Sequence, residues 1–229
     1  PWSPAMPYTP ELNLVGDTYH TLNVFPELAP SDAPVAELNP AERADSPNRE
    51  FRYCIRLHRA GQQLMTWYGN QTGTVLFDSD VHIPAIFQCR DGEPGVWNTF
   101  PWMSLTPAEI LTLREGSRLA KGRVVIAGLG LGHQLIEVSK RLTVKEIVLV
   151  ERSQELVDFY LPRVRPLVKK RLTVLVGDAH EIVPTLRADV ALIDIFPAYG
   201  GNEPATRELA RRSPNIKKMW GWGTAELRR

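Results

Sequence analysis

From residue 123 onward, short apolar runs alternate with segments in which apolar and polar positions are mixed. The runs predict buried strands, and the segments between them predict helices. The expected strands are 124–127, 146–150, 172–176, 189–195 and a short 216–220, and the expected helices are 133–141, 153–161, 179–186 and 203–212. This alternation is typical of right-handed crossovers in a parallel sheet covered on both faces. The predicted fold class is therefore α/β, with a doubly wound (Rossmann-like) parallel sheet that ends after about five strands.

The pattern before residue 106 is different. Short strand-like segments separated by glycine-containing turns predict a small antiparallel sheet. The expected strands are 52–58, 63–68, 74–78 and 83–88, and the stretch 91–101 is expected to be a loop. A helix should follow, because Thr106 suits the N-cap, Pro107 the first helical position and Glu109 the third.

Proline sets the first 50 residues apart. Nine of the nineteen prolines fall there, with few apolar clusters between them, which predicts an extended arm with little structure of its own. The chain thus divides into a proline-rich arm (1–50), a small antiparallel β region (51–105) and a Rossmann-like domain with a basic C-terminal tail (106–229).

Composition narrows the class of protein. An apolar content of 43% in 229 residues is enough for a core, and no apolar stretch approaches the ~18 residues of a membrane-spanning helix. We therefore expect a soluble, cytoplasmic protein without a membrane partner. Cys54 and Cys89 lack metal-ligand spacing and are read as small buried hydrophobic residues, so no metal is expected.

The basic tail bears on partners. Residues 207–229 hold seven basic side chains against Glu208 and Glu226. A solvated basic face is favoured over nucleic-acid binding, but Trp220 and Trp222 among the basic residues keep the second reading open.

A glycine-rich turn separates the first parallel strand from its helix. Gly128, Gly130 and Gly132 alternate with leucines directly after the apolar run 124–127. Glycines at such a junction let the main chain bend tightly and lie against a ligand with no side chain between. The spacing is not the Gly-x-Gly-x-x-Gly of dinucleotide sites, because the third glycine comes one residue early and His133 follows it.

Carboxylates end three successive strands of the predicted sheet. They are Glu151, Asp178 within Gly177-Asp178-Ala179, and Asp194. Open parallel sheets bind their ligands at this edge, although each acid alone could be a helix cap or a solvated residue. His133 and His180 are read as structural or solvent-facing, and Tyr199 as either part of a substrate lid or a plain loop aromatic.

The Gly-x-Gly-x-Gly turn and the three acids, in this order, resemble the class I S-adenosylmethionine-dependent methyltransferase superfamily over about residues 123–203. The resemblance implies S-adenosylmethionine as the cofactor and a cofactor site made by Gly128, Gly130, Gly132, Glu151, Asp178 and Ala179. The same resemblance implies that Glu151 accepts hydrogen bonds from the ribose hydroxyls and that Asp178 accepts one from the adenine amino group. Asp194 becomes the candidate catalytic base or substrate anchor for in-line methyl transfer to a small-molecule or unknown acceptor.

Within this superfamily the chain resembles the spermidine-synthase-like branch. Those enzymes place a small antiparallel sheet first, with a segment like 73–76, and an aspartate at the position of Asp194. The chain departs from them at Leu131, where they carry an aspartate, and from many methyltransferases at Ile126, where an acid is common. A methyltransferase, an aminopropyltransferase and a non-catalytic nucleoside-binding or partner-binding relative all remain open. Self-association through the edge of the fifth strand or through the arm also remains open.

Overall fold

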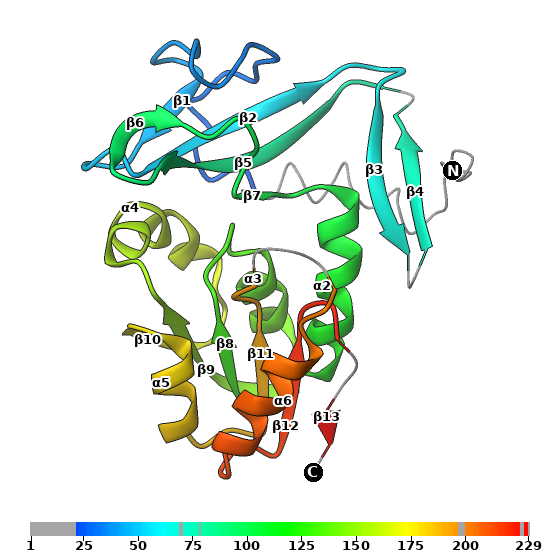
Figure 1. Ribbon diagram of the computed structural model, residues 1–229, viewed down its shortest axis with the longest axis vertical. Coiled ribbons are helices and arrows are strands. Elements are labelled where there is room, and N and C mark those ends of the chain that lie inside the picture. Colours follow the sequence, from blue (N-terminus) through cyan, green and yellow to red (C-terminus); the bar gives the residue numbers. More distant parts are fainter. Residues whose placement is uncertain (1–21, 69–70, 78, 197–199, 225–226, 229) are drawn as a thin grey trace. The chain divides into compact units, whose positions relative to one another are not determined.

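The computed structural model describes residues 22–68, 71–77, 79–196, 200–224 and 227–228 (Figure 1). The chain divides into two compact units, Pro1–Leu111 and Thr112–Arg229. The division falls within helix α2, Pro107–Leu119. Each unit is described below by itself.

The first unit is an antiparallel β structure, as the sequence predicted. Its main sheet has the order β1-β2-β5-β6, with β7 also paired to β5, while β3 and β4 pair in a separate two-stranded sheet. The strands are β1 (Arg43–Asp45), β2 (Phe51–His58), β3 (Gln63–Tyr68), β4 (Gln71–Leu76), β5 (Val81–Arg90), β6 (Glu93–Trp97) and β7 (Met103–Ser104).

The stretch 91–101 is not wholly a loop, and that expectation was wrong. Asp91 and Gly92 form a tight turn between β5 and β6, with Gly92 at φ 73°. Glycine adopts this positive φ without strain, which favours Gly92 at the turn. Gly92 therefore forms the hairpin turn, and Pro94 and Gly95 lie within β6.

Residues 22–50 also differ from the arm expected for residues 1–50. Within this described part, β1 joins the sheet, and Leu22, Phe25 and Leu38 are buried. Arg52 supplies a physical reason, because its buried guanidinium group donates to both carboxylate oxygens of Asp45 and to the carbonyl of Val35. Residues 1–21 lie outside the described residues.

Helix α2 begins where its N-terminal signals predicted. The peptide N–H of Glu109 donates to Thr106 Oγ1 at 3.4 Å, and Glu109 Oε2 accepts from the peptide N–H of Ser104 at 3.3 Å. Pro107 is the first helical residue. Thr106 thus satisfies one of the N–H groups that a helix start leaves without partners, and Glu109 holds the chain that leads into the helix by accepting from Ser104.

The second unit alternates strands and helices. Its elements after α2 are β8 (Gly122–Ala127), α3 (His133–Lys140), β9 (Val144–Glu151), α4 (Gln154–Val164), β10 (Arg171–Val176), α5 (Ala179–Ile182), β11 (Val190–Ile193), α6 (Glu203–Arg212), β12 (Lys218–Gly221) and β13 (Leu227–Arg228). The helix predicted for 179–186 is shorter, because the chain continues as a 3-10 turn at Val183–Thr185, around Pro184.

The strands of the second unit form one sheet in the order β10-β9-β8-β11-β12-β13. The first five are mutually parallel, as predicted, and β13 pairs antiparallel with β12. The order reverses between β8 and β11, which is the switch point at which doubly wound sheets bind ligands. Because β13 covers the outer side of β12, an open fifth strand no longer argues for self-association.

Helices cover both faces of this sheet. Val125, Val148 and Ala191 point to one face and pack with Ala179 of α5 and Leu209 of α6. On the other face, α2 approaches β12 so closely that a Cβ on Gly116 would lie 2.4 Å from the ring of Trp220. Side chains alternate between the faces of a strand, so neighbouring residues of β8 and β9 supply both cores. Among the helices that the structure describes, none has the length and apolar character needed to cross a membrane.

Candidate functional site

The glycine turn connects the end of β8 to the start of α3. Gly128, Gly130 and Gly132 have φ of 100°, 55° and 74°, a region that glycine adopts without strain. A Cβ on Gly128 would lie 2.1 Å from the carbonyl oxygen of Asp194, and one on Gly132 would lie 2.7 Å from Val164 Cγ1. Packing and conformation both require glycine at these two positions, so the turn presents bare main chain.

Hydrogen bonds between strand ends bring the predicted site residues to one edge. The peptide N–H of Gly128 donates to the carbonyl of Val150, and that of Asp194 donates to the carbonyl of Ala127. The N–H of Gly177 donates to the carbonyl of Glu151. The carboxyl ends of β8, β9, β10 and β11 therefore lie in one row.

Glu151 is the last residue of β9, and its side chain is buried. Its Oε2 accepts from the peptide N–H of Leu129 at 2.8 Å, and its Oε1 accepts from that of Ser153 at 2.9 Å. The carboxylate therefore joins the glycine turn to the start of α4. A carboxylate oxygen can accept two hydrogen bonds, so each oxygen keeps capacity for one more donor.

Asp178 and Ala179 lie where β10 passes into α5, and they have different surroundings. Asp178 is exposed and is the N-cap of α5, with Oδ1 accepting from the peptide N–H of His180 at 2.7 Å. Ala179 is buried in the core beneath α5. Asp178 thus has a structural role already, and the side chain of Ala179 serves packing.

Asp194 follows β11 directly. The residue is partly buried, and burial raises the pKa of its carboxyl group to about 7. Within the part of the chain that the structure describes, no hydrogen bond or ion pair reaches this carboxyl group. The pKa of this carboxyl group is therefore higher than that of an ordinary aspartate, which is fully ionised at neutral pH. Tyr199, the predicted lid residue, lies outside the described residues.

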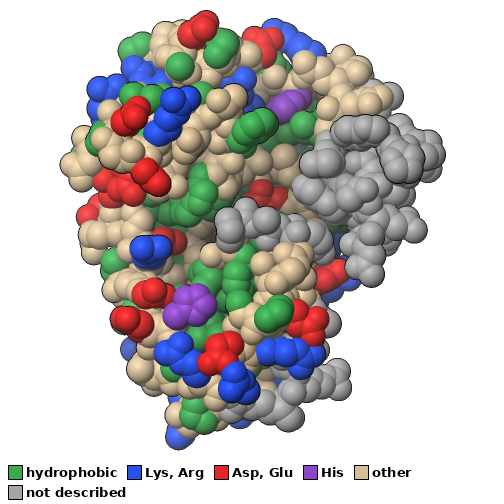
Figure 2. Space-filling model, in the orientation of Figure 1, with side chains coloured by type: hydrophobic (Ala, Val, Ile, Leu, Met, Phe, Trp, Pro, Cys, Tyr) green, Lys and Arg blue, Asp and Glu red, His purple; other side chains and the backbone are tan. Residues whose placement is uncertain are grey.

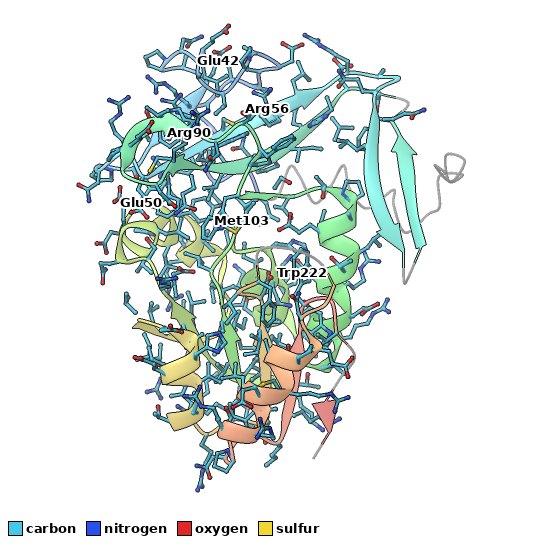
Figure 3. The ribbon with its side chains drawn as sticks, viewed as in Figure 1. Glu42, Glu50, Arg56, Arg90, Met103 and Trp222 are labelled. Atoms are coloured by element: carbon cyan, nitrogen blue, oxygen red, sulfur yellow. The ribbon has the colours of Figure 1, made fainter. Side chains whose placement is uncertain are left out.

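Two further aromatic residues contact the main chain at the carboxyl edge: Tyr160 contacts the glycine turn, and Trp222 contacts the end of β11. The hydroxyl of Tyr160 in α4 donates to the carbonyl of Leu131 at 3.1 Å. Trp222, labelled in Figure 3, follows β12, and its peptide N–H donates to the carbonyl of Ile193 at 2.8 Å. Its indole N–H donates to Thr112 Oγ1 of α2 at 2.9 Å. No local sequence motif indicates either contact, because both depend on how distant elements pack.

His133 begins α3 and is buried, as is the next residue, Gln134. Burial lowers the pKa of His133 to about 4, so the imidazole is neutral at pH 7. Its Nδ1 and Gln134 Oε1 lack hydrogen-bond partners among the described residues. This burial agrees with the structural role expected for His133.

The structure also locates the two apolar positions at which the chain departs from its suspected relatives. Ile126 and Leu131 are both buried in the core. Neither position supplies a charge to the carboxyl edge. Among the described residues, no cluster of histidine, cysteine, aspartate and glutamate could hold a metal ion.

No protein-family model and no curated protein matches the sequence. Several solved structures resemble parts of the fold. One is a protein from Porphyromonas gingivalis W83 that is described as a putative methyltransferase. It is 19% identical with a TM-score of 0.40, and the match covers 51% of this chain and 31% of that one. A dimethyladenosine transferase from Plasmodium falciparum is 18% identical with a TM-score of 0.39, over 50% of this chain and 40% of that one.

A third similar structure is TrmK from M. capricolum, in complex with S-adenosyl-homocysteine. It is 14% identical with a TM-score of 0.38, over 47% of this chain and 48% of that one. The present chain thus spans less than half the length of each of these three proteins. At such low identities and TM-scores, a functional assignment has to rest on the geometry of the chain itself.

Proposed function

We propose that the chain binds S-adenosylmethionine at the carboxyl edge of its parallel sheet and transfers the methyl group to an acceptor. The observation that carries the proposal is the bare glycine turn, which closes against the main chain of Asp194 and is bonded to the carboxylate of Glu151. Main-chain glycine beside acids at a switch point suits the polar, close-fitting surface of a nucleoside.

The residues at this edge fit the adenosyl part of such a ligand. The turn offers main chain for close approach, and Glu151 keeps one acceptor site on each oxygen for the ribose hydroxyls. Asp178 has only Oδ1 engaged among the described residues, which leaves Oδ2 for a donor such as an exocyclic amino group. The methionine part has a weaker match, because Ile126 and Leu131 are buried and uncharged.

When bound, S-adenosylmethionine supplies a methyl group activated by its sulfonium charge. Asp194 would then act as the base or anchor for the acceptor. A carboxyl group with a pKa of about 7 is partly ionised at neutral pH and can take a proton from an acceptor N–H or O–H. The main-chain carbonyl of Asp194 lies against Gly128, so the residue is a neighbour of the turn that would hold the cofactor.

Aminopropyl transfer of the spermidine-synthase kind would use the same edge and the same aspartate. Asp194 favours it, whereas the buried Leu131 stands where those enzymes carry an acid. A non-catalytic relative that binds only the nucleoside is the third alternative. Of the two transferases, we favour the methyltransferase, because aminopropyl transfer also calls for the acid that Leu131 replaces.

Isothermal titration calorimetry on the full chain tests the proposal. S-adenosylmethionine and S-adenosylhomocysteine should bind, whereas NAD should not. Tighter binding of decarboxylated S-adenosylmethionine would favour aminopropyl transfer instead.

Asp178→Ala should weaken adenosine binding by about 1 to 3 kcal/mol if its carboxylate accepts a charge-assisted bond. Asp178→Asn is the matched control, because asparagine also caps helices well and thereby separates lost capping from lost charge. The absence of heat with every ligand would refute the cofactor assignment.

A further inference from the structure

The edge of the parallel sheet opposite the glycine turn is strongly basic. Here β8, β9, β10 and β11 begin, and basic residues lie within three residues of each start. We call the following set the basic edge: Lys121, Lys145, Lys169, Lys170, Arg171 and Arg187. Five of the six side chains are exposed and Lys170 is partly exposed.

Strand register brings these residues together. Gly122, next to Lys121, is paired with Val144, next to Lys145, and Arg171 is paired with Glu146. Ala188, next to Arg187, forms a bridge with Ile216 at the start of the β12 segment. Lys145 also lies near enough to Asp189 to contribute to the lowering of the pKa of that carboxyl group.

The acids at the strand starts are already engaged. Glu146 pairs with Arg123 at 3.4 Å, and Asp189 pairs with Lys217 at 2.6 Å and accepts from the peptide N–H of Arg123 at 2.9 Å. None of the six residues of the basic edge forms an ion pair within the described part of the chain. Their charge is therefore available to an external anion.

We propose that the basic edge binds the phosphate backbone of a nucleic acid. Neighbouring strands lie about 4.8 Å apart, so the starts of four adjacent strands span roughly 15 Å. Along the axis of a duplex, each strand carries one phosphate about every 3.4 Å, so an edge of this length faces about four phosphates of one strand. Such contacts give affinity without base sequence preference.

A protein partner is a poorer fit to this edge. Interfaces between proteins have an apolar, often aromatic centre with few charges. At the basic edge, Leu142 is the one large apolar side chain among the described residues that is strongly exposed. By contrast, the face around α5 and α6 shows acidic and basic side chains interspersed (Figure 2).

The inference does not rest on the proposed cofactor. It concerns the opposite edge of the sheet, separated from the glycine turn by the length of β9. Eight residues in a strand span about 26 Å. Binding there would anchor a nucleic acid to the second unit. A failure to bind S-adenosylhomocysteine in calorimetry would contradict the cofactor proposal but not this one.

Fluorescence anisotropy of the full chain with labelled 20-nucleotide probes tests the proposal. Single-stranded RNA, single-stranded DNA and duplex DNA are each titrated at 50 and 200 mM KCl. Wild-type protein should bind at least one probe and lose affinity steeply with salt. The triple variant Lys169→Glu, Lys170→Glu, Arg171→Glu should weaken binding by about tenfold or more. A second triple variant, Lys121→Glu, Lys145→Glu, Arg187→Glu, should do the same and covers the case in which the first fails to fold.

The matched control reverses the same number of exposed charges in the first unit, with Arg49→Glu, Arg59→Glu and Arg90→Glu. Arg59 pairs with two exposed aspartates, and such pairs contribute little to stability. The control should change the dissociation constant less than about threefold, and circular dichroism should show all variants folded. Equal weakening by control and edge variants, absence of wild-type binding at 50 mM KCl, or equal competition by polyglutamate of the same charge would overturn the proposal.

Discussion

Glu151 shows how one residue can carry both structure and a candidate function. Its buried carboxylate accepts from two peptide N–H groups, one in the glycine turn and one at the start of α4. Buried peptide donors without acceptors are costly, so the acid is needed even without a ligand. The family resemblance points to the ligand role alone, whereas the structure adds the structural one.

Replacing Glu151 by alanine should therefore destabilise the chain. Two peptide N–H groups would lose their acceptor, at a cost of about 1 to 3 kcal/mol each. The control is Glu146→Ala in the same strand, where a partly exposed ion pair is worth under about 1 kcal/mol. Chemical denaturation of both variants measures the difference. Equal stabilities for the two variants would show that Glu151 does not hold the turn.

Asp194 should leave a mark on the pH dependence of stability. Its folded pKa of about 7 lies above the value of about 3.9 in an unfolded chain, so the folded state holds the proton more tightly. Stability from this group is fully present below pH 4 and is lost as pH rises toward 7. Asparagine does not ionise, so Asp194→Asn does not lose this stability as pH rises. The melting temperature of Asp194→Asn, relative to that of the wild type, should therefore increase from pH 4 to pH 8.

Calorimetric melting at several pH values checks this expectation. Asp178→Asn, which makes the same chemical change at an exposed position, serves as the control. A constant difference between Asp194→Asn and wild type across the range would mean that the carboxyl group is not shifted. The role of Asp194 as a base near neutral pH would then lose its support.

At the scale of elements, the glycine turn is the feature that the sequence predicted most directly. Three alternating glycines after an apolar run predicted the turn between β8 and α3, and the alternating segments predicted the order of strands and helices that the fold confirms. Local signals suffice here, because glycine conformation and apolar periodicity are properties of short segments.

Gly128 provides a test at this scale. In Gly128→Ala, the new Cβ would lie 2.1 Å from a main-chain oxygen, in addition to the cost of a positive φ. Gly61→Ala is the control, since Gly61 has φ 83° and open space around its Cβ position. We expect about 1 kcal/mol of destabilisation for Gly61→Ala and at least about 3 kcal/mol for Gly128→Ala.

Urea unfolding of the two alanine variants measures both values. Similar losses would indicate that the turn shifts to admit a methyl group. The close approach of β11 to the turn would then not be a fixed feature of the site.

Other elements could not be predicted because their causes are not local. The stretch 91–101 was expected to be a loop, whereas Gly92 forms the turn of the β5–β6 hairpin, whose pairing depends on the neighbouring sheet. Residues 22–50 join the first unit because Arg52, seventeen positions beyond Val35, needs buried acceptors. Strand β13 is two residues long and depends on β12 to exist.

For the molecule as a whole, the sheet of the second unit has two chemically different edges. The carboxyl edge holds the glycine turn and three acids, and the amino edge holds the basic residues. The sequence predicted the first edge because its residues follow strands directly and resemble a known pattern. The amino edge could not be predicted from the sequence, because its basic residues are scattered from 121 to 187 and come together only in the folded sheet.

A crystal structure of the full chain grown with S-adenosylhomocysteine would show directly whether the carboxyl edge of the sheet binds the cofactor. We predict density for the nucleoside against the main chain of Gly128–Gly132, with its ribose at Glu151 and its adenine near Asp178. A carboxyl edge that stays empty at saturating ligand, or a ligand bound elsewhere, would contradict it.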